Sequence, residues 1–292
     1  MPSSGAAEGR HGGLRVFHAR PMPCGVRACP TAITRFHSAA IASMRTIKLT
    51  LAYDGTAYAG WQIQSRGRTL QETLETALAK ITGEPVRVTA SGRTDAGVHA
   101  LGQVVGFRTE SKLSPEILLR ALNAGLPRDM AVLDAAEAPE GFHATISAKR
   151  KRYRYRIYDG PIRDVFRRQT TWHCARGLDV ESMDRAAQAL RGTHDFSSFE
   201  TQGSKRKTSV RTIYDISARR GLDGDGHLIA VEVEADGFLY NMVRTIVGTL
   251  VKVGRHARSE SWVADVLAAV DRRAAGPTAP PQGLVLLSVQ YE

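Results

Sequence analysis

The stretch SGRTDAGVHA, residues 91–100, contains a single carboxylate among residue types that could do chemistry. Arg93 stands two positions before Asp95, His99 stands four positions after it, and Gly92 and Gly97 flank it. An ionised carboxylate can act as a nucleophile, as a general base or as an electrostatic stabiliser of developing positive charge. Asp and Gly are also ordinary turn residues, so a turn without a chemical role is the alternative interpretation.

The basic stretch KRKRYRYR, residues 149–156, is a second candidate group. In a strand, alternation places Tyr153 and Tyr155 on one face and the arginines at 152, 154 and 156 on the other. One face could stack on a base and the other could contact phosphate. The alternative is an edge strand whose Lys and Arg discourage aggregation, with both tyrosines in the core.

Arg244 is the third candidate, within LYNMVRTIVGTLVKVG, residues 239–254. The apolar residues of this segment recur at helical spacing, which places Arg244 at the margin of a broad apolar stripe. An arginine in that position either extends its charged end to water or pairs with a carboxylate.

The elements that must position these residues follow from periodicity. Alternating apolar residues predict a strand over 46–54, and Leu70, Leu74 and Leu78 predict a helix opened by a capping box of Thr69 and Glu72. Strands near 86–90 and 103–108, a helix opened by Ser114 and Pro115, and a strand near 131–137 complete a β-α-β-β-α-β order.

The second half repeats this order with one helix added. The pattern predicts a strand over 152–158, a helix near 180–191, strands near 212–219 and 228–235, a helix near 239–253, an extra helix from Ser259 and a last strand over 284–291. We therefore expect an α+β fold of two similar halves, 44–148 and 149–292, that form a continuous, mainly antiparallel sheet with helices on one face.

Charge and composition narrow the classes of partner. The formal net charge is +11 and the isoelectric point is about 9.9, which favours a polyanion such as RNA or DNA. No run of eighteen apolar residues occurs, so no membrane span is expected.

Residues 1–43 differ from the rest of the chain, with five arginines, one acid and no lysine. This leader is interpreted as disordered or removable: either an organelle transit peptide or an extension upstream of a start at Met44. The cysteines match no strong zinc pattern, so neither a metal nor a disulfide is expected.

Several motifs together resemble the tRNA pseudouridine synthase A family. They are GRTDAGVHA (92–100), YDGTAYAGWQ (53–62), KRYRYRIY (151–158), HDFSSF (194–199), TSVRTI (208–213) and NMVRTIVGTL (241–250). The resemblance covers Thr46 to Tyr291. It implies a homodimer without metal or cofactor that isomerises uridines 38, 39 and 40 in the anticodon arm of tRNA.

The resemblance also implies residue roles. Asp95 matches the catalytic aspartate, Tyr153 matches the tyrosine that stacks on the target base, and Arg93 and Arg244 match the arginines that support base flipping and pair with the aspartate. His99 and His143 are expected to be structural hydrogen-bonding residues. The segment ETQGSKRKTS, residues 200–209, lies where the family diverges, so no RNA contact is assigned to it.

The chemistry fits those residue types. Pseudouridine formation breaks the N1–C1′ bond, turns the uracil, forms a C5–C1′ bond and releases the C5 proton, and one ionised carboxylate can assist it. An adjacent arginine lowers the pKa of a carboxyl, and an aromatic ring offsets the cost of unstacking the base. Whether Asp95 attacks C1′, attacks the ring or removes a proton stays open.

Two other functions remain as alternatives. One is a non-catalytic tRNA-binding or chaperone module, and the other is a metal-dependent nuclease, which the lack of a second acid near Asp95 disfavours. The expected location is the cytoplasm, or an organelle if the leader is a transit peptide.

Overall fold

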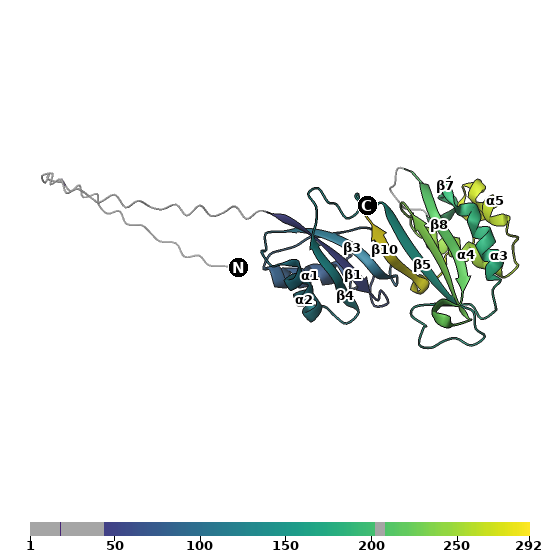
Figure 1. Cartoon of the computed structure of the whole chain (residues 1–292), viewed down its shortest axis with the longest axis horizontal. Helices are drawn as coiled ribbons and strands as arrows, with labels where there is room; N and C mark the ends of the chain where they lie inside the picture. The colour runs from purple at the N-terminus through teal and green to yellow at the C-terminus, as the bar shows by residue number, and fades with distance from the viewer. Residues whose placement is uncertain (1–17, 19–43, 202–207) are drawn as a thin grey trace, which may run out of the picture. The chain divides into compact units, whose positions relative to one another are not determined.

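The computed structural model describes residue 18 and residues 44–201 and 208–292 (Figure 1). The described residues from 44 to 292 belong to one compact unit. The leader predicted for residues 1–43 therefore lies almost entirely outside the described residues, as does most of the divergent segment 200–209.

The first half has the β-α-β-β-α-β order that the periodicity predicts. Its elements are β1 (Arg45–Tyr53), α1 (Leu70–Thr82), β2 (Val88–Ala90), β3 (His99–Thr109), α2 (Pro115–Gly125) and β4 (Met130–Glu137). The Thr69 hydroxyl accepts a hydrogen bond from the Glu72 N–H, and the Ser114 hydroxyl accepts one from the Ile117 N–H. These side chains satisfy N–H groups that a helix start leaves without an internal partner.

The second half repeats the order with α5 added. Its elements are β5 (Arg150–Tyr158), β6 (Trp172–His173), α3 (Val180–Ala187), β7 (Gly192–Asp195), β8 (Val210–Arg220), β9 (Leu228–Ala235), α4 (Met242–Gly254), α5 (Trp262–Ala269) and β10 (Leu284–Gln290). The sequence did not predict β6 and β7. These strands are two and four residues long, too short for an alternating pattern to show.

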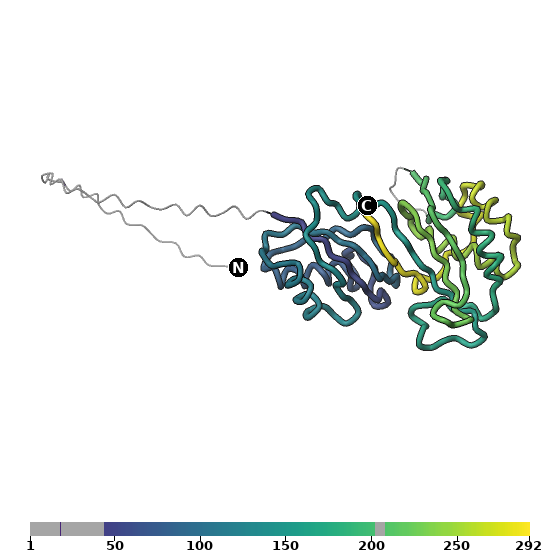
Figure 2. Tube along the Cα trace, in the orientation of Figure 1, coloured from purple at the N-terminus to yellow at the C-terminus, as the bar shows by residue number. Residues whose placement is uncertain are grey.

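The ten strands of the described residues belong to one sheet, with the order β4-β1-β3-β10-β5-β9-β8-β7 and with β2 and β6 paired to β3 and β5. Every pairing is antiparallel except β10 with β3 and β6 with β5. Figure 2 shows β10, in yellow, running between the two halves. The last strand of the chain therefore joins the halves into the continuous, mainly antiparallel sheet that was expected.

The register places the apolar residues of both halves on one face. Tyr53 pairs with Ala100, Ala100 with Leu286, and Leu286 with Tyr153, so these four residues share a face of the sheet. All four are buried, and Tyr153 is 9% exposed. Among the helices (Figure 1), α2 packs against β4, α3 against β8 and α4 against β5, while α1 contacts α2 and α5 contacts α3.

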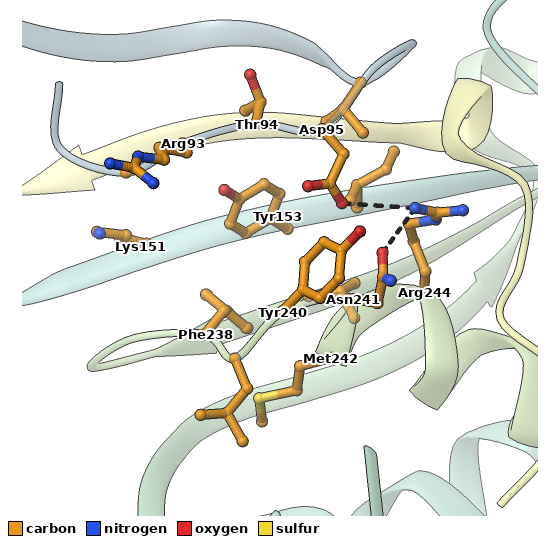
Figure 3. A pocket seen from close by; sticks show the side chains of 15 residues that line it. Arg93, Thr94, Asp95, Lys151, Tyr153, Phe238, Tyr240, Asn241, Met242 and Arg244 are labelled. Atoms are coloured by element: carbon orange, nitrogen blue, oxygen red, sulfur yellow. Dashed lines mark hydrogen bonds and ion pairs between the residues drawn. The ribbon is translucent and has the colours of Figure 1, made fainter. Parts of the chain in front are cut away.

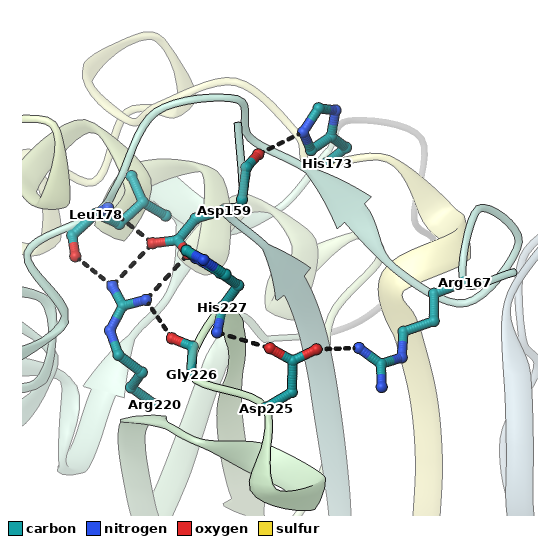
Figure 4. Close-up of polar contacts among 9 residues, drawn as sticks. Asp159, Arg167, His173, Leu178, Arg220, Asp225, Gly226 and His227 are labelled. Carbon is teal, nitrogen blue, oxygen red and sulfur yellow. Dashed lines mark hydrogen bonds and ion pairs between the residues drawn. The ribbon is translucent and has the colours of Figure 1, made fainter. Parts of the chain in front are cut away.

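A buried ion pair fixes the end of β5 to the end of β8 (Figure 4). The Asp159 side chain is 1% exposed, and Arg220 donates to its two oxygens at 3.0 and 2.8 Å. The Leu178 N–H donates to the same carboxylate at 3.0 Å. Burial raises the pKa of Asp159, but these hydrogen bonds and the charge of Arg220 outweigh burial and hold the pKa below its ordinary value.

Candidate active site

The loop that carries Asp95 spans residues 91–98, between β2 and β3. The sequence predicted a loop that included His99, but β3 begins at that residue, because Val285 of β10 pairs with it. His99 is buried and its imidazole has several partners: the Gly55 N–H donates to Nδ1 at 3.1 Å, the Asp54 Oδ1 atom also lies 3.1 Å from Nδ1, and Nε2 lies 2.8 Å from the Gln169 carbonyl oxygen. This geometry is that of a structural hydrogen-bonding residue.

Buried polar side chains hold this loop in place. Gln103, which is fully buried in β3, accepts from the Ser91 hydroxyl at 2.6 Å and donates to the Gly92 carbonyl at 2.8 Å. The Tyr53 hydroxyl lies 2.9 Å from the Thr94 hydroxyl. Since a buried polar group without a partner is costly, these bonds favour one loop conformation over others.

The close approach of residues 53–62 to the loop explains a glycine in the YAGWQ motif. Gly60 has a φ of 104°, and a Cβ there would lie 3.0 Å from the Thr94 carbonyl oxygen. The Trp61 N–H then donates to that same oxygen at 2.9 Å. A side chain at position 60 would meet both a backbone clash and an unfavourable φ.

Asp95 pairs with Arg244, which lies in the first turn of α4 (Figure 3). The Arg244 Nη1 atom lies 3.4 Å from the Asp95 Oδ2 atom, and these side chains are 15% and 33% exposed. Two further acceptors orient the guanidinium: its Nε donates to the Ala279 carbonyl at 2.7 Å, and Nη1 donates to the Asn241 Oδ1 atom at 2.7 Å. Residues of the second half of the chain therefore hold the Arg244 guanidinium in place beside the Asp95 carboxylate.

The pKa of Asp95 reflects two opposed effects. Burial of the carboxyl raises its pKa above the ordinary value of 3.8, while the charge of Arg244 and its hydrogen bond lower it only in part. The sequence-based expectation that the arginine lowers this pKa describes one contribution correctly. The net direction is upward because burial is the larger effect.

A pocket of about 610 Å³ surrounds this pair, and all four residues predicted for the site line it. The ring of Tyr153 meets the ring of Phe238 edge-on, with centroids 5.0 Å apart. Figure 3 draws Arg93 beside Lys151, at the end of the pocket away from the Asp95–Arg244 pair. Among the described residues, Asp95 forms its ion pair with Arg244. The expected pairing of Arg93 with Asp95 is not found among them.

Sequence reasoning missed several other residues that line this pocket. They are Phe238, Leu239, Tyr240, Asn241, Met242 and Val243, all at the start of α4 or just before it, together with Val98 and Leu284. At Asn241 the residue type was the signal in the sequence: Asn tolerates the left-handed conformation, and it adopts that conformation here at the start of α4, with a φ of 61°. The others are apolar or aromatic and have no feature that separates them from core residues.

The basic face of β5 differs from its expected role. Arg152 pairs with Asp215, Glu232 and Glu234 at 2.9 to 3.1 Å, and Arg154 pairs with Glu232. These arginines are thus neutralised by carboxylates of β8 and β9. β5 is not an edge strand, because it pairs with both β10 and β9.

Tyr153 and Tyr155 of β5 face the same side but have different environments. Tyr155 is fully buried, and its hydroxyl donates to the Pro280 carbonyl at 2.7 Å. Tyr153 lines the pocket of Asp95. Tyr155 is therefore a core residue, and Tyr153 is the tyrosine of this strand that a bound base could meet.

Within the residues that the structure describes, no group of three or more His, Cys, Asp or Glu side chains could hold a metal ion. No helix in the same residues is long and apolar enough to cross a membrane.

Comparison with known proteins assigns the chain to a family. The profile of the tRNA pseudouridine synthase family matches residues 50–145 and 186–292. A protein of Thermoanaerobacter sp. (strain X514) named tRNA pseudouridine synthase A is 46% identical over 248 residues, which cover 85% of this chain and 100% of that protein. Its namesake in Halalkalibacterium halodurans is 50% identical over 243 residues, which cover 83% and 91%.

A chain in a solved structure of a Cbf5–Nop10–Gar1 complex aligns with 82% of this chain and 48% of its own, at 12% identity and a TM-score of 0.34. That likeness is too distant to add to the assignment, which depends on the sequence matches. They confirm the resemblance that the motifs gave: the chain belongs to the tRNA pseudouridine synthase family, whose members are isomerases that act on tRNA.

Proposed function

We propose that this chain isomerises uridines 38, 39 and 40 in the anticodon arm of tRNA, with Asp95 as the catalytic carboxylate. The observation that carries the assignment of Asp95 is its ion pair with Arg244 in a pocket of about 610 Å³ that also contains the ring of Tyr153. The position of the uridines rests on the resemblance to the tRNA pseudouridine synthase A family.

In this proposal the target uridine leaves its stack and enters the pocket. Unstacking costs a few kcal/mol, and an aromatic ring under the base returns about 1–3 kcal/mol. Tyr153 supplies that ring, and its contact with Phe238 fixes the ring orientation. Arg93 and Arg244 support the flipped state from opposite ends of the pocket (Figure 3).

Asp95 acts in its ionised form. It assists cleavage of the N1–C1′ bond and formation of the C5–C1′ bond, after which the C5 proton leaves. Arg244 opposes the upward effect of burial on the pKa of Asp95 and so keeps more of the carboxyl charged at neutral pH. Attack on C1′, attack on the ring and proton removal all require this charge.

The test is release of tritium from tRNA that carries tritium at uridine C5. Asp95→Asn should abolish release while tRNA affinity stays near that of the wild type. Asp134→Asn, at an exposed position of β4 outside the pocket, is the matched control and should keep full activity. Normal turnover by Asp95→Asn would refute the assignment, and tight binding without release by the wild type would favour the binding-module alternative.

Asp95→Asn should also fold normally, and the direction of the Asp95 pKa shift gives the reason. A carboxyl whose pKa is raised by folding is more costly to bury when charged, so it lowers stability at neutral pH, and this cost vanishes below the ordinary value of 3.8. Asp95→Asn removes the charge. Its melting temperature at neutral pH should therefore equal or exceed that of the wild type, which separates loss of chemistry from loss of fold.

We also propose that the enzyme acts as a homodimer in which one tRNA lies across both subunits, and that it acts in the cytoplasm or in an organelle that holds tRNA. The division into halves 44–148 and 149–292 belongs to the same proposal, with Asp95 from the first half and Arg244 from the second. Sedimentation tests the dimer, because an active monomer would contradict it.

A further inference from the structure

A second cavity adjoins the pocket of Asp95. Its volume is about 590 Å³, and it lies toward β2 and the start of α1. It shares four lining residues with the pocket of Asp95: Gly92, Arg93, Lys151 and Phe238. The two cavities therefore meet along a boundary built from two cations, one aromatic ring and a glycine.

The boundary has the chemistry that a phosphodiester requires. Arg93 is exposed, and the Lys151 ammonium is anchored at 2.6 Å from the Ser91 carbonyl oxygen. A Cβ at position 92 would lie 3.2 Å from that ammonium, so glycine leaves the cation room. Figure 3 draws the ends of Arg93 and Lys151 on the same side of Tyr153. Two such cations favour the phosphate that links one nucleoside to the next.

The boundary also offers an aromatic ring to both cavities. Phe238 is partly exposed and lines the two cavities, while its edge-on contact with Tyr153 at 5.0 Å fixes its orientation. An aromatic side chain in this position can stack on a base whatever the base is, because every base has a π-face.

The far wall of the second cavity carries polar side chains held in place. The Gln62 amide donates to the Gln71 Oε1 atom at 2.9 Å, and the Gln71 amide donates to Glu75 at 2.8 Å. Gln71 is 4% exposed, so it is a rigid support for Gln62. A carboxamide fixed in this way can hydrogen-bond the edge of an unstacked base.

We propose that this second cavity binds the nucleotide next to the target uridine in the RNA chain. The target lies in the pocket of Asp95, the linking phosphate lies on Arg93 and Lys151, and the neighbouring base enters the second cavity against Phe238. This inference rests on the function proposed above and deepens it: the enzyme holds two consecutive nucleotides out of the stack and not one.

The first test changes only the RNA. Dissociation constants and single-turnover rates are measured for wild-type enzyme with tRNAs that lack the base immediately 5′ or immediately 3′ of the target. Loss of the base on one side should weaken binding about five-fold or more, the smallest effect of a lost base stack. Loss on the other side should change it little. Equal affinity for both abasic tRNAs and intact tRNA would overturn the proposal.

The second test fills the cavity from the protein side. Thr89 lines this cavity and not the pocket of Asp95, and it is exposed on β2, so Thr89→Phe adds a ring there without touching the proposed catalytic residues. Thr89→Val is the matched control of similar size. Thr89→Phe should weaken binding of intact tRNA but bind the sensitive abasic tRNA as the wild type does. Equal weakening on both tRNAs would overturn the proposal.

These affinities are independent of turnover, so the two proposals fail separately. If intact tRNA shows no tritium release with wild-type enzyme, the proposed isomerase function fails, whatever the abasic tRNAs do. If release is normal but no base dependence appears on either side, only the second cavity loses its assignment. Melting temperatures of the Thr89 variants check that both are folded, and the abasic tRNA comparison needs no variant.

Discussion

Replacing Arg244 by glutamine should make the reaction more sensitive to acid. The Arg244 Nη1 atom lies 3.4 Å from the Asp95 Oδ2 atom, so removal of its charge removes an attraction that favours the ionised carboxyl. At this distance, two unit charges attract by about 1 kcal/mol in water and about 5 kcal/mol at an effective dielectric constant of about 20. The Asp95 side chain is 33% exposed, which favours the lower end of that range.

A loss of about 1.4 kcal/mol corresponds to a factor of about ten in the equilibrium between the two protonation states. With Arg244→Gln, the acidic limb of the pH–rate profile should therefore move to higher pH. On the acidic side, the rate should fall by roughly ten-fold beyond any loss that is independent of pH. Glutamine retains an amide donor, so part of the contact with Asn241 can survive.

The assay is tritium release measured as kcat/KM across the acidic limb, because that quantity reports the pKa of groups in the free enzyme. Lys252→Gln is the matched control, since Lys252 is a cation in the last turn of α4 and does not line the pocket. Its profile should match the wild type. If the Arg244→Gln profile were lower but parallel to the wild-type profile, Arg244 would act by position alone and the electrostatic argument would be refuted.

Three further predictions concern binding, stability and stacking. In a salt titration of tRNA binding, Lys151→Met should reduce the slope of log affinity against log salt by about 0.7–0.9. Arg152→Met should leave this slope unchanged, because three carboxylates neutralise Arg152. Arg220→Met should cost about 3 kcal/mol at pH 7 by leaving the buried Asp159 carboxylate without its guanidinium partner. Because folding lowers the pKa of Asp159, the ion pair stabilises the fold above pH 3.8, and this stabilisation is lost as pH falls through the folded pKa. In thermal unfolding, Arg220→Met should therefore differ less from the wild type at acidic pH. Tyr153→Phe should bind tRNA like the wild type, and Tyr153→Leu should lose much of its rate in a single-turnover assay, since only the former keeps the ring.

Local signals were sufficient for most of the elements. In β1, Ile47, Leu49 and Leu51 alternate with less buried residues and all three are fully buried, so the period of two gave the strand directly. The Thr69 and Ser114 caps located two helix starts because each hydroxyl bonds a backbone N–H within three residues. Such features depend on neighbours in the sequence, which is why one sequence sufficed.

Features that depend on distant pairing could not be read in the same way. The start of β3 at His99 is set by β10, which lies at the other end of the chain. Arg152 looked open to phosphate because its acidic partners follow about 60 to 80 residues later. A charge pattern in one strand therefore cannot separate a phosphate-binding residue from one that is already paired.

In the candidate site, too, some features could be predicted from local residue types, whereas others depend on contacts between distant parts of the chain. Residue types and motifs identified Asp95 and Arg244, which are 149 positions apart, but only the fold brings them to 3.4 Å and fixes the arginine through Asn241 and Ala279. The net direction of the Asp95 pKa also depended on burial, which no local pattern reports. Arg93 stands two residues from Asp95 in the sequence, yet Figure 3 draws it beside Lys151 at the boundary of the second cavity. The resemblance therefore gave the carboxylate two arginine partners where the structure pairs it with Arg244, and Arg93 lies instead with Lys151 at the cationic edge of the second cavity.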